Sequence, residues 1–192
     1  MKSAIRVRFL VVLLTVCLGS AAQADQSTWD TMAQPGVHAL VRHALAPGMG
    51  DPANFQVDDC TTQRILDSRG RQQATQIGEA LRQQGIRFDQ VLSSQWCRCL
   101  ETAELMKMGS VQVEPMLNSF FSRPGKSKAQ TSALRAFLSS LPSDSKTLLV
   151  THQVNITALT GIFPRSGEMV LVALSPDNNQ LEVVGRLMPA PL

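Results

Sequence analysis

The sequence predicts an α/β protein, a three-layer sandwich in which a mostly parallel central sheet is covered by helices on both faces. Short apolar runs alternate along the chain with segments of helical periodicity, and no internal repeat interrupts them. Polar residues directly follow three of the apolar runs. Because ligands collect beyond the carboxyl ends of strands in such sheets, this pattern also predicts a pocket at that edge.

The segment 37–41 (VHALV) is a short apolar run typical of a buried strand, and Arg42 and His43 follow at its C-terminal end. The next stretch, 46–59, is rich in glycine, proline and aspartate and has no hydrophobic period, so we expect a loop. A long loop directly after a strand is usually functional. Together these features place Arg42 and His43 at the edge of a predicted site.

The remaining elements follow from the spacing of apolar residues and from helix-ending signals. A helix at 69–84 has Ala74, Ile77 and Leu81 on one face, and Gly85 fits its C-cap. Three more helices and five more strands are expected. The helices are at 96–108, 131–141 and 154–160, and the strands are at 89–93, 111–113, 146–150, 169–174 and 181–184, the last two forming a hairpin. The stretch 118–130 predicts a second loop at the site.

The first 24 residues predict a cleaved export signal. Basic residues precede an apolar stretch at 9–18 that is too short to span a bilayer, and the 22–24 triplet (AQA) fits the small-x-small cleavage pattern. We therefore expect a periplasmic mature chain, 25–192, with one domain. Its 168 residues suffice to close a core, and no stretch after the signal predicts a membrane span.

Loss of this signal makes the protein nearly neutral. The chain has 18 basic and 15 acidic residues, and three of the basic ones, Lys2, Arg6 and Arg8, belong to the signal. A balanced charge gives no support for nucleic acid binding or for a basic membrane-surface patch. Any preference for an anion must therefore come from a local site.

Three cysteines remain in the mature chain: Cys60, Cys97 and Cys99. Disulfides persist in an oxidising compartment, so we expect one bridge from Cys60 to either Cys97 or Cys99 and one leftover thiol. The sequence does not choose between these pairings. The Cys97-x-Cys99 spacing is a poor zinc pattern, and we expect no metal there.

Two arginines and two histidines carry the predicted chemistry. Arg42 and Arg98 have planar guanidinium groups that can contact two phosphoryl oxygens at once. A neutral imidazole can attack phosphorus and form a phosphoramidate that water later hydrolyses, which is the role expected of His43. His152 follows the strand at 146–150 and is expected to stabilise the transferring group by charge and hydrogen bonding.

Three ordered blocks resemble the histidine phosphatase (phosphoglycerate mutase-like) superfamily. They are LVRHA at 40–44, LSSQWCRCLETA at 92–103 and VTHQ at 150–153. The resemblance covers nearly the whole mature chain and implies a phosphoglycerate mutase-like fold, a small phosphorylated substrate, and phosphomonoester hydrolysis without a metal or cofactor. It implies that His43 is the nucleophile, that Arg42, Arg98 and His152 form the phosphate pocket, and that Arg64 is a further phosphate contact.

One departure from the family pattern concerns the proton donor to the leaving group. Many members place a Glu directly after a Leu-Asn pair, whereas here Leu117-Asn118 is followed by Ser119. A leaving group that needs little protonation, such as phosphohistidine, is one explanation. The other is a replacement donor from a neighbouring loop, for which the candidates are Asp51, Asp58, Asp59 and Glu114.

Two classes of function remain open on the sequence. The export signal and the long loop are similar to those of an exported subgroup that includes lipopolysaccharide heptose phosphatase-like proteins, which implies an enzyme acting on an envelope sugar phosphate. The alternative, motivated by Ser119, is a non-catalytic phosphate-binding or phosphoglycan-binding module that has lost the proton donor. A phosphoryl group trapped on His43 separates the two.

Overall fold

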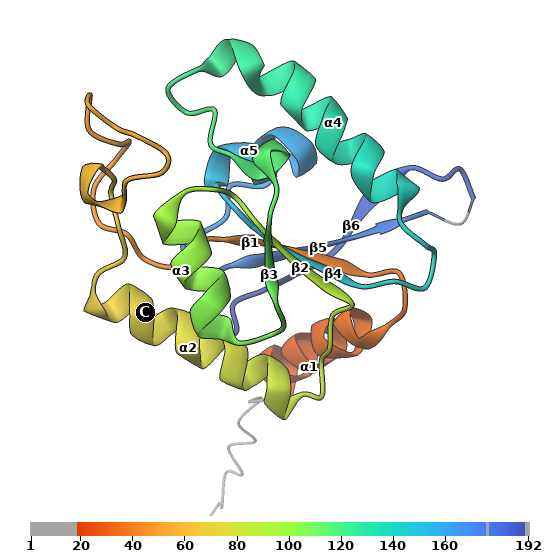
Figure 1. Cartoon of the computed structure of the whole chain (residues 1–192). Helices are drawn as coiled ribbons and strands as arrows, with labels where there is room; N and C mark the ends of the chain where they lie inside the picture. Colours follow the sequence, from red (N-terminus) through yellow and green to blue (C-terminus); the bar gives the residue numbers. More distant parts are fainter. Residues whose placement is uncertain (1–18, 176, 191–192) are drawn as a thin grey trace, which may run out of the picture.

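The fold is built around one central β-sheet. The computed structural model describes residues 19–175 and 177–190, in which six strands form one sheet in the order β3-β2-β4-β1-β5-β6 (Figure 1). Neighbouring strands pair in parallel from β3 to β1, whereas β5 pairs antiparallel with both β1 and β6. The bounds are β1 (His38–Arg42), β2 (Gln90–Ser93), β3 (Val111–Val113), β4 (Thr147–Thr151), β5 (Met169–Leu174) and β6 (Leu181–Leu187).

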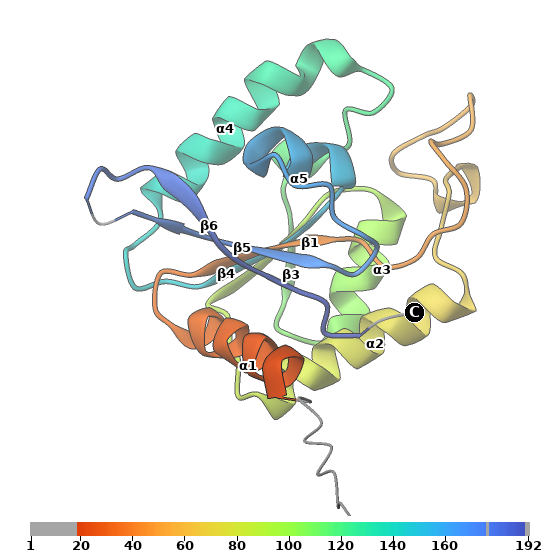
Figure 2. The same ribbon diagram turned by 180° about the vertical axis from the view of Figure 1, so that it is seen from behind.

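Helices cover both faces of this sheet (Figures 1 and 2). One face carries α1 (Gly19–Ala33), α2 (Ser68–Gln83) and α3 (Cys97–Met106), and the other carries α4 (Ser127–Ser140) and α5 (Gln153–Thr160). Short 3-10 turns lie at η1 (Cys60–Thr62), η2 (Pro115–Leu117) and η3 (Pro124–Lys126). The predicted α/β sandwich with a mostly parallel sheet is thus confirmed. None of the described helices is long and apolar enough to cross a bilayer.

Two apolar cores sandwich the sheet, because successive residues of a strand point to opposite faces. In β1, Ala39 and Val41 pack with Ile77 of α2 on one side, whereas Leu40 packs with Leu134 of α4 on the other. All these side chains are buried. A strand that is covered on both faces has a nearly continuous apolar sequence. This is why polar and apolar residues do not alternate in VHALV.

The structure differs from the predicted elements mainly at the ends of the chain. The expected signal at 1–24 lies outside the described residues up to residue 18, and the rest falls in the first part of α1. This helix was not predicted, although its Trp29 and Met32 join the core. α4 begins at Ser127 rather than 131, since η3 leads directly into it, and β6 extends to Leu187.

A glycine sets the distance between α2 and α3. An added Cβ at Gly78 would lie 1.9 Å from the carbonyl oxygen of Met106, far inside contact distance. Because that oxygen is backbone at the end of α3, no side-chain rotation can relieve the clash. The packing of α3, which bears Arg98, therefore depends on the missing side chain.

We expect Gly78→Ala to destabilise the protein by about 1–3 kcal/mol, the usual cost of overpacking a core. Urea unfolding followed by circular dichroism measures the change. Gly125→Ala is the matched control, since no atom outside its neighbours lies within 4 Å of the Cβ added there. Equal unfolding midpoints for the two variants would contradict the role of Gly78.

Candidate active site

The sheet register brings the two predicted histidines together. Arg42 at the end of β1 lies opposite Thr151 at the end of β4, so the next residues, His43 and His152, leave neighbouring parallel strands at the same edge. The His43 amide donates a hydrogen bond to the Thr151 carbonyl at 3.0 Å. The two imidazole rings lie 5.5 Å apart between centroids, and both side chains are buried.

The hydrogen bonds of His43 determine which of its ring nitrogens carries the proton. Its Nδ1 lies 2.8 Å from the carbonyl oxygen of Ala44, which can only accept, so Nδ1 carries the proton. Nε2 then has the lone pair, and it accepts a hydrogen bond from Arg98 Nε at 3.2 Å. The ring is therefore oriented with a nucleophilic nitrogen toward the arginine.

Arg98 is the centre of the site. It is the second residue of α3 and is only 2% exposed. Its Nε and Nη2 face the two histidines, because Nε donates to His43 and Nη2 lies 3.4 Å from His152 Nδ1. The side edge of the guanidinium thus points to the space between the two rings.

Asp51 holds the other end of the same guanidinium. Its two carboxylate oxygens accept from Arg98 Nη1 at 2.7 Å and from Nη2 at 3.2 Å. The carboxylate also accepts from the Trp96 indole at 2.9 Å and from the Arg64 amide at 3.2 Å. The end of the Arg98 fork is therefore fixed by Asp51, and this arrangement directs the side edge at the histidines.

Two further arginines surround the cavity. Arg42 donates from Nη1 to the Pro164 carbonyl, and its buried Nε has no hydrogen-bond partner among the described residues. Arg64 donates from its side chain to the carbonyl oxygens of Gly50 and Ala46, so it also fastens the loop after β1. Burial and the charge of Arg98 lower the pKa of Arg64 to about 10, which leaves it charged at neutral pH.

His152 is supported by polar residues that the sequence analysis did not assign to the site. Its Nε2 lies 2.9 Å from Ser94 Oγ, which in turn donates to Asn118 Oδ1 at 3.1 Å. Ser94 is one of the polar residues that follow a predicted strand at this edge, although its sequence context favours a role in shaping the turn before the helix at 96–108. Its position directly after the strand at 89–93, at the same edge as the histidines, was the available signal.

Of the candidate proton donors, only Asp51 lines the cavity. Asp58 is exposed, Asp59 caps η1 by accepting from Thr61, and Glu114 precedes η2; these three do not line the cavity. Burial favours the protonated form of Asp51, but its hydrogen bonds and the charge of Arg98 prevail and lower its pKa. Asp51 is therefore a bound carboxylate in this structure.

The first loop is covalently attached to the site. Cys60 and Cys97 form a disulfide, which resolves the pairing that the sequence left open, and Cys99 is a buried free thiol. Cys97 directly precedes Arg98, so the bridge joins the loop of Asp51 to the neighbour of the residue that Asp51 binds. Burial raises the pKa of the Cys99 thiol to about 12, which keeps it protonated.

The three arginines, the two histidines and Asp51 line one cavity of about 440 Å3. Arg42, Arg64 and Arg98 contribute cations, His43 and His152 contribute imidazoles, and the surrounding wall includes Met49, Phe121 and Phe163. The described part of the chain has no cluster of three or more His, Cys, Asp or Glu side chains that could hold a metal ion. Among the described residues that line the cavity, the arginines carry the positive charge available to an anion.

Residues 38–120 match the family model of the histidine phosphatase superfamily (branch 1). The match spans two of the three blocks noted in the sequence and confirms the resemblance. No curated protein matches the chain in sequence.

Solved structures share the fold at low sequence identity. The protein histidine phosphatase SixA in complex with tungstate is 19% identical, with a TM-score of 0.56 over 80% of this chain and 97% of that one. A phosphoserine phosphatase mutant from Entamoeba histolytica in complex with phosphoserine is 13% identical, with a TM-score of 0.58 over 80% and 97%. Mycobacterial glucosyl-3-phosphoglycerate phosphatase Rv2419c is 16% identical, with a TM-score of 0.56 over 82% and 100%. The fold is thus that of the phosphoglycerate mutase-like phosphatases.

We expect Asp51→Asn to lower kcat/KM for phosphate esters roughly 10- to 100-fold, because Arg98 loses the charge that aligns it. Steady-state kinetics with an aryl phosphate measure the change, and the melting temperature reports on folding. Asp58→Asn, which removes an exposed carboxylate from the same loop, is the control. Unchanged kinetics in the Asp51 variant would show that Arg98 does not need this partner.

The buried histidines predict that the protein becomes less stable as the pH decreases. Burial, assisted by Arg98, lowers the pKa of His43 and His152 well below 6.5, and burial lowers that of His38. Because the unfolded chain binds these protons more readily, the stabilisation present above pH 6.5 is lost progressively as the pH falls below that value. The melting temperature should therefore drop between pH 7 and pH 5, where ordinary carboxyl groups stay ionised.

Substituting His43 by Asn should make that drop smaller, since one of the protonating groups is gone. Differential scanning calorimetry of both proteins across this pH range measures the effect. A melting temperature independent of pH in the unsubstituted protein would contradict neutral burial of the histidines.

Proposed function

We propose that this protein is an exported, metal-independent phosphatase that hydrolyses a phosphomonoester through a phosphohistidine intermediate on His43. The family match and the phosphatases among the structural neighbours support phosphatase activity in general. The observation that carries the specific proposal is His43 Nε2, unprotonated and aimed at a space that Arg98 and His152 also face.

The mechanism follows from these positions in two displacements. The lone pair of His43 Nε2 exchanges its hydrogen bond with Arg98 Nε for a bond to phosphorus. The bond from phosphorus to the ester oxygen breaks, and that oxygen departs with the electron pair and takes a proton from water. Water then attacks the phosphoramidate, the nitrogen–phosphorus bond breaks, and inorganic phosphate leaves. The Nδ1–H bond to the Ala44 carbonyl stabilises the positive charge that the imidazole acquires during the first step.

The arginines stabilise the transferring group. Phosphoryl transfer requires neutralisation of charge on three equatorial oxygens. Arg98 is placed to present its side edge to them, and the buried Nε of Arg42 has no partner among the described residues. His152, which is hydrogen-bonded to Ser94, follows the neighbouring strand β4 and faces the same space. The site thus offers charge and fixed donors around one tetrahedral anion.

Export is supported by the leader and by the chemistry of the cysteines. A basic start, an apolar stretch and a small-x-small triplet precede residue 25. The disulfide between Cys60 and Cys97 is of a kind that persists in oxidising compartments such as the periplasm. We propose the periplasm as the location on these two grounds.

A phosphate-binding module without catalysis is the second candidate, and Ser119 at the place of the usual acid favours it. Such a protein would bind phosphate at the same arginines. It would form no covalent bond to His43 and release no product, so phosphoenzyme trapping separates the two functions.

The purified protein should hydrolyse para-nitrophenyl phosphate in EDTA, and His43→Ala should abolish turnover, because the nitrogen that would form the phosphoramidate is removed. Acid-free quenching and intact mass spectrometry should find one phosphoryl group on His43. The control is His38→Gln, a buried histidine at the opposite end of β1. Hydrolysis of normal rate by the His43 variant would refute the covalent mechanism.

A further inference from the structure

The mouth of the cavity is apolar, in contrast to its cationic interior. Met49, Phe121 and Phe163 line the cavity, and they are 84%, 52% and 68% exposed. Met49 and Phe163 are the two most exposed large hydrophobic side chains in the described part of the chain. Exposed apolar side chains that are grouped around a cavity are typical of a ligand contact, whereas singly scattered ones are not.

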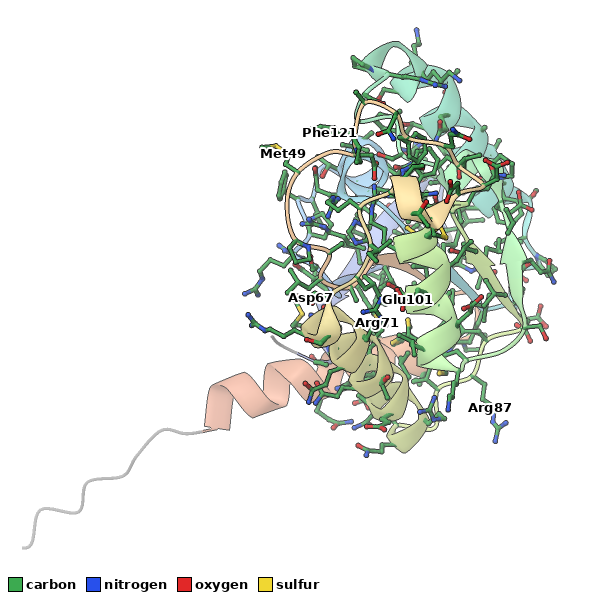
Figure 3. The ribbon with its side chains drawn as sticks, turned by 60° about the vertical axis from the view of Figure 1, so that its left-hand side comes forward. Met49, Asp67, Arg71, Arg87, Glu101 and Phe121 are labelled. Carbon is green, nitrogen blue, oxygen red and sulfur yellow. A yellow bond between two sulfur atoms is a disulfide. The ribbon has the colours of Figure 1, made fainter. Side chains whose placement is uncertain are left out.

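The three side chains come from separate segments that converge at one edge of the sheet. Met49 lies in the loop after β1, Phe121 follows η2, and Phe163 follows α5. Figure 3 shows Met49 and Phe121 at the same end of the molecule, and a Cβ at Gly50 would lie 3.7 Å from the Phe121 ring. An apolar collar, defined here as Met49, Phe121 and Phe163, therefore borders the phosphate site.

Two uncharged polar side chains, Gln153 and Ser119, also line the cavity, and each makes a local hydrogen bond. Gln153 donates to Thr157 Oγ1 at 2.9 Å, and Ser119 Oγ accepts from the Phe121 amide at 3.3 Å. A sugar bound there would bring several hydroxyl groups that need partners. The collar instead matches a flat apolar group, which aromatic side chains contact by stacking.

An independent observation concerns the departure of the leaving group. Asp51 is the only carboxylate among the residues that line the cavity, and it accepts four hydrogen bonds, two of them from Arg98. It therefore has no proton to deliver. Without a general acid the leaving group of an ester departs as an anion, which among esters favours an alcohol of low basicity.

We infer that the substrate of this site is an aryl phosphate monoester, whose aromatic ring lies in the apolar collar and leaves as a phenolate. A phenol, with a pKa of about 10 as in tyrosine, is a far better unprotonated leaving group than an alkyl alcohol. This inference rests on the proposed phosphatase function and narrows its substrate. It replaces an envelope sugar phosphate with an aromatic ester.

Three small esters separate the two parts of this inference. Phenyl and cyclohexyl phosphate have similar size and are both apolar, but only the first leaves as a phenolate; glucose 6-phosphate is polar. The purified protein should hydrolyse phenyl phosphate roughly 100-fold or more faster than cyclohexyl phosphate, the usual contribution of a missing general acid. Cyclohexyl phosphate should still inhibit more strongly than glucose 6-phosphate, because it fills the collar.

Variants of the collar test the contact itself. Phe163→Ala and Phe121→Ala should each raise KM for phenyl phosphate about fivefold, in line with partial loss of a buried aromatic contact. Inhibition by inorganic phosphate, which does not reach the collar, should stay unchanged. Val113→Ala removes an exposed apolar side chain of β3 that does not line the cavity, and serves as the control.

Equal rates for phenyl and cyclohexyl phosphate would overturn the leaving-group argument, and an unchanged KM in both collar variants would overturn the binding argument. Faster hydrolysis of glucose 6-phosphate would overturn the inference while leaving the phosphatase proposal standing. If none of the three esters forms a phosphoenzyme on His43, both proposals fail.

Discussion

The site is organised around the guanidinium group of Arg98. Its side edge faces His43 and His152, and its end is held by the carboxylate of Asp51. A buried cation of this kind is costly unless it is paired and hydrogen-bonded, and here the pairing comes from the protein itself. Because the donors are fixed before any ligand arrives, an anion entering the cavity meets an electrostatic environment that needs little rearrangement.

Burial, assisted by the charge of Arg98, explains why the two histidines are neutral. Three arginines and one aspartate line the cavity, so an additional proton on His43 would be repelled while the ring is also shielded from water. Both effects favour the neutral imidazole, which is the form that can share an electron pair. The same residues that would bind phosphate thus keep the nucleophile ready at physiological pH.

The sequence predicted the sheet and the convergence of His43 and His152 because both depend on strand ends, which apolar runs reveal. It did not predict α1, since that helix adjoins a segment interpreted as a signal, nor the contacts of Ser94 and Asp51. Such contacts depend on side-chain directions across segments far apart in the chain. The cysteine pairing was open for the same reason: Cys97 and Cys99 are two residues apart, and only the orientation of α3 turns the first to the loop and the second inward.

The disulfide connects residues 37 positions apart and fastens the loop of Asp51 beside Arg98. The bridge reduces the conformational freedom of the loop that bears Asp51. This carboxylate is therefore kept near Arg98 by a covalent link as well as by electrostatic attraction. A newly made chain with reduced thiols would hold the same residues without that link. Assembly of the anion site is in this way coupled to the oxidation state of the surroundings in which the chain completes its folding.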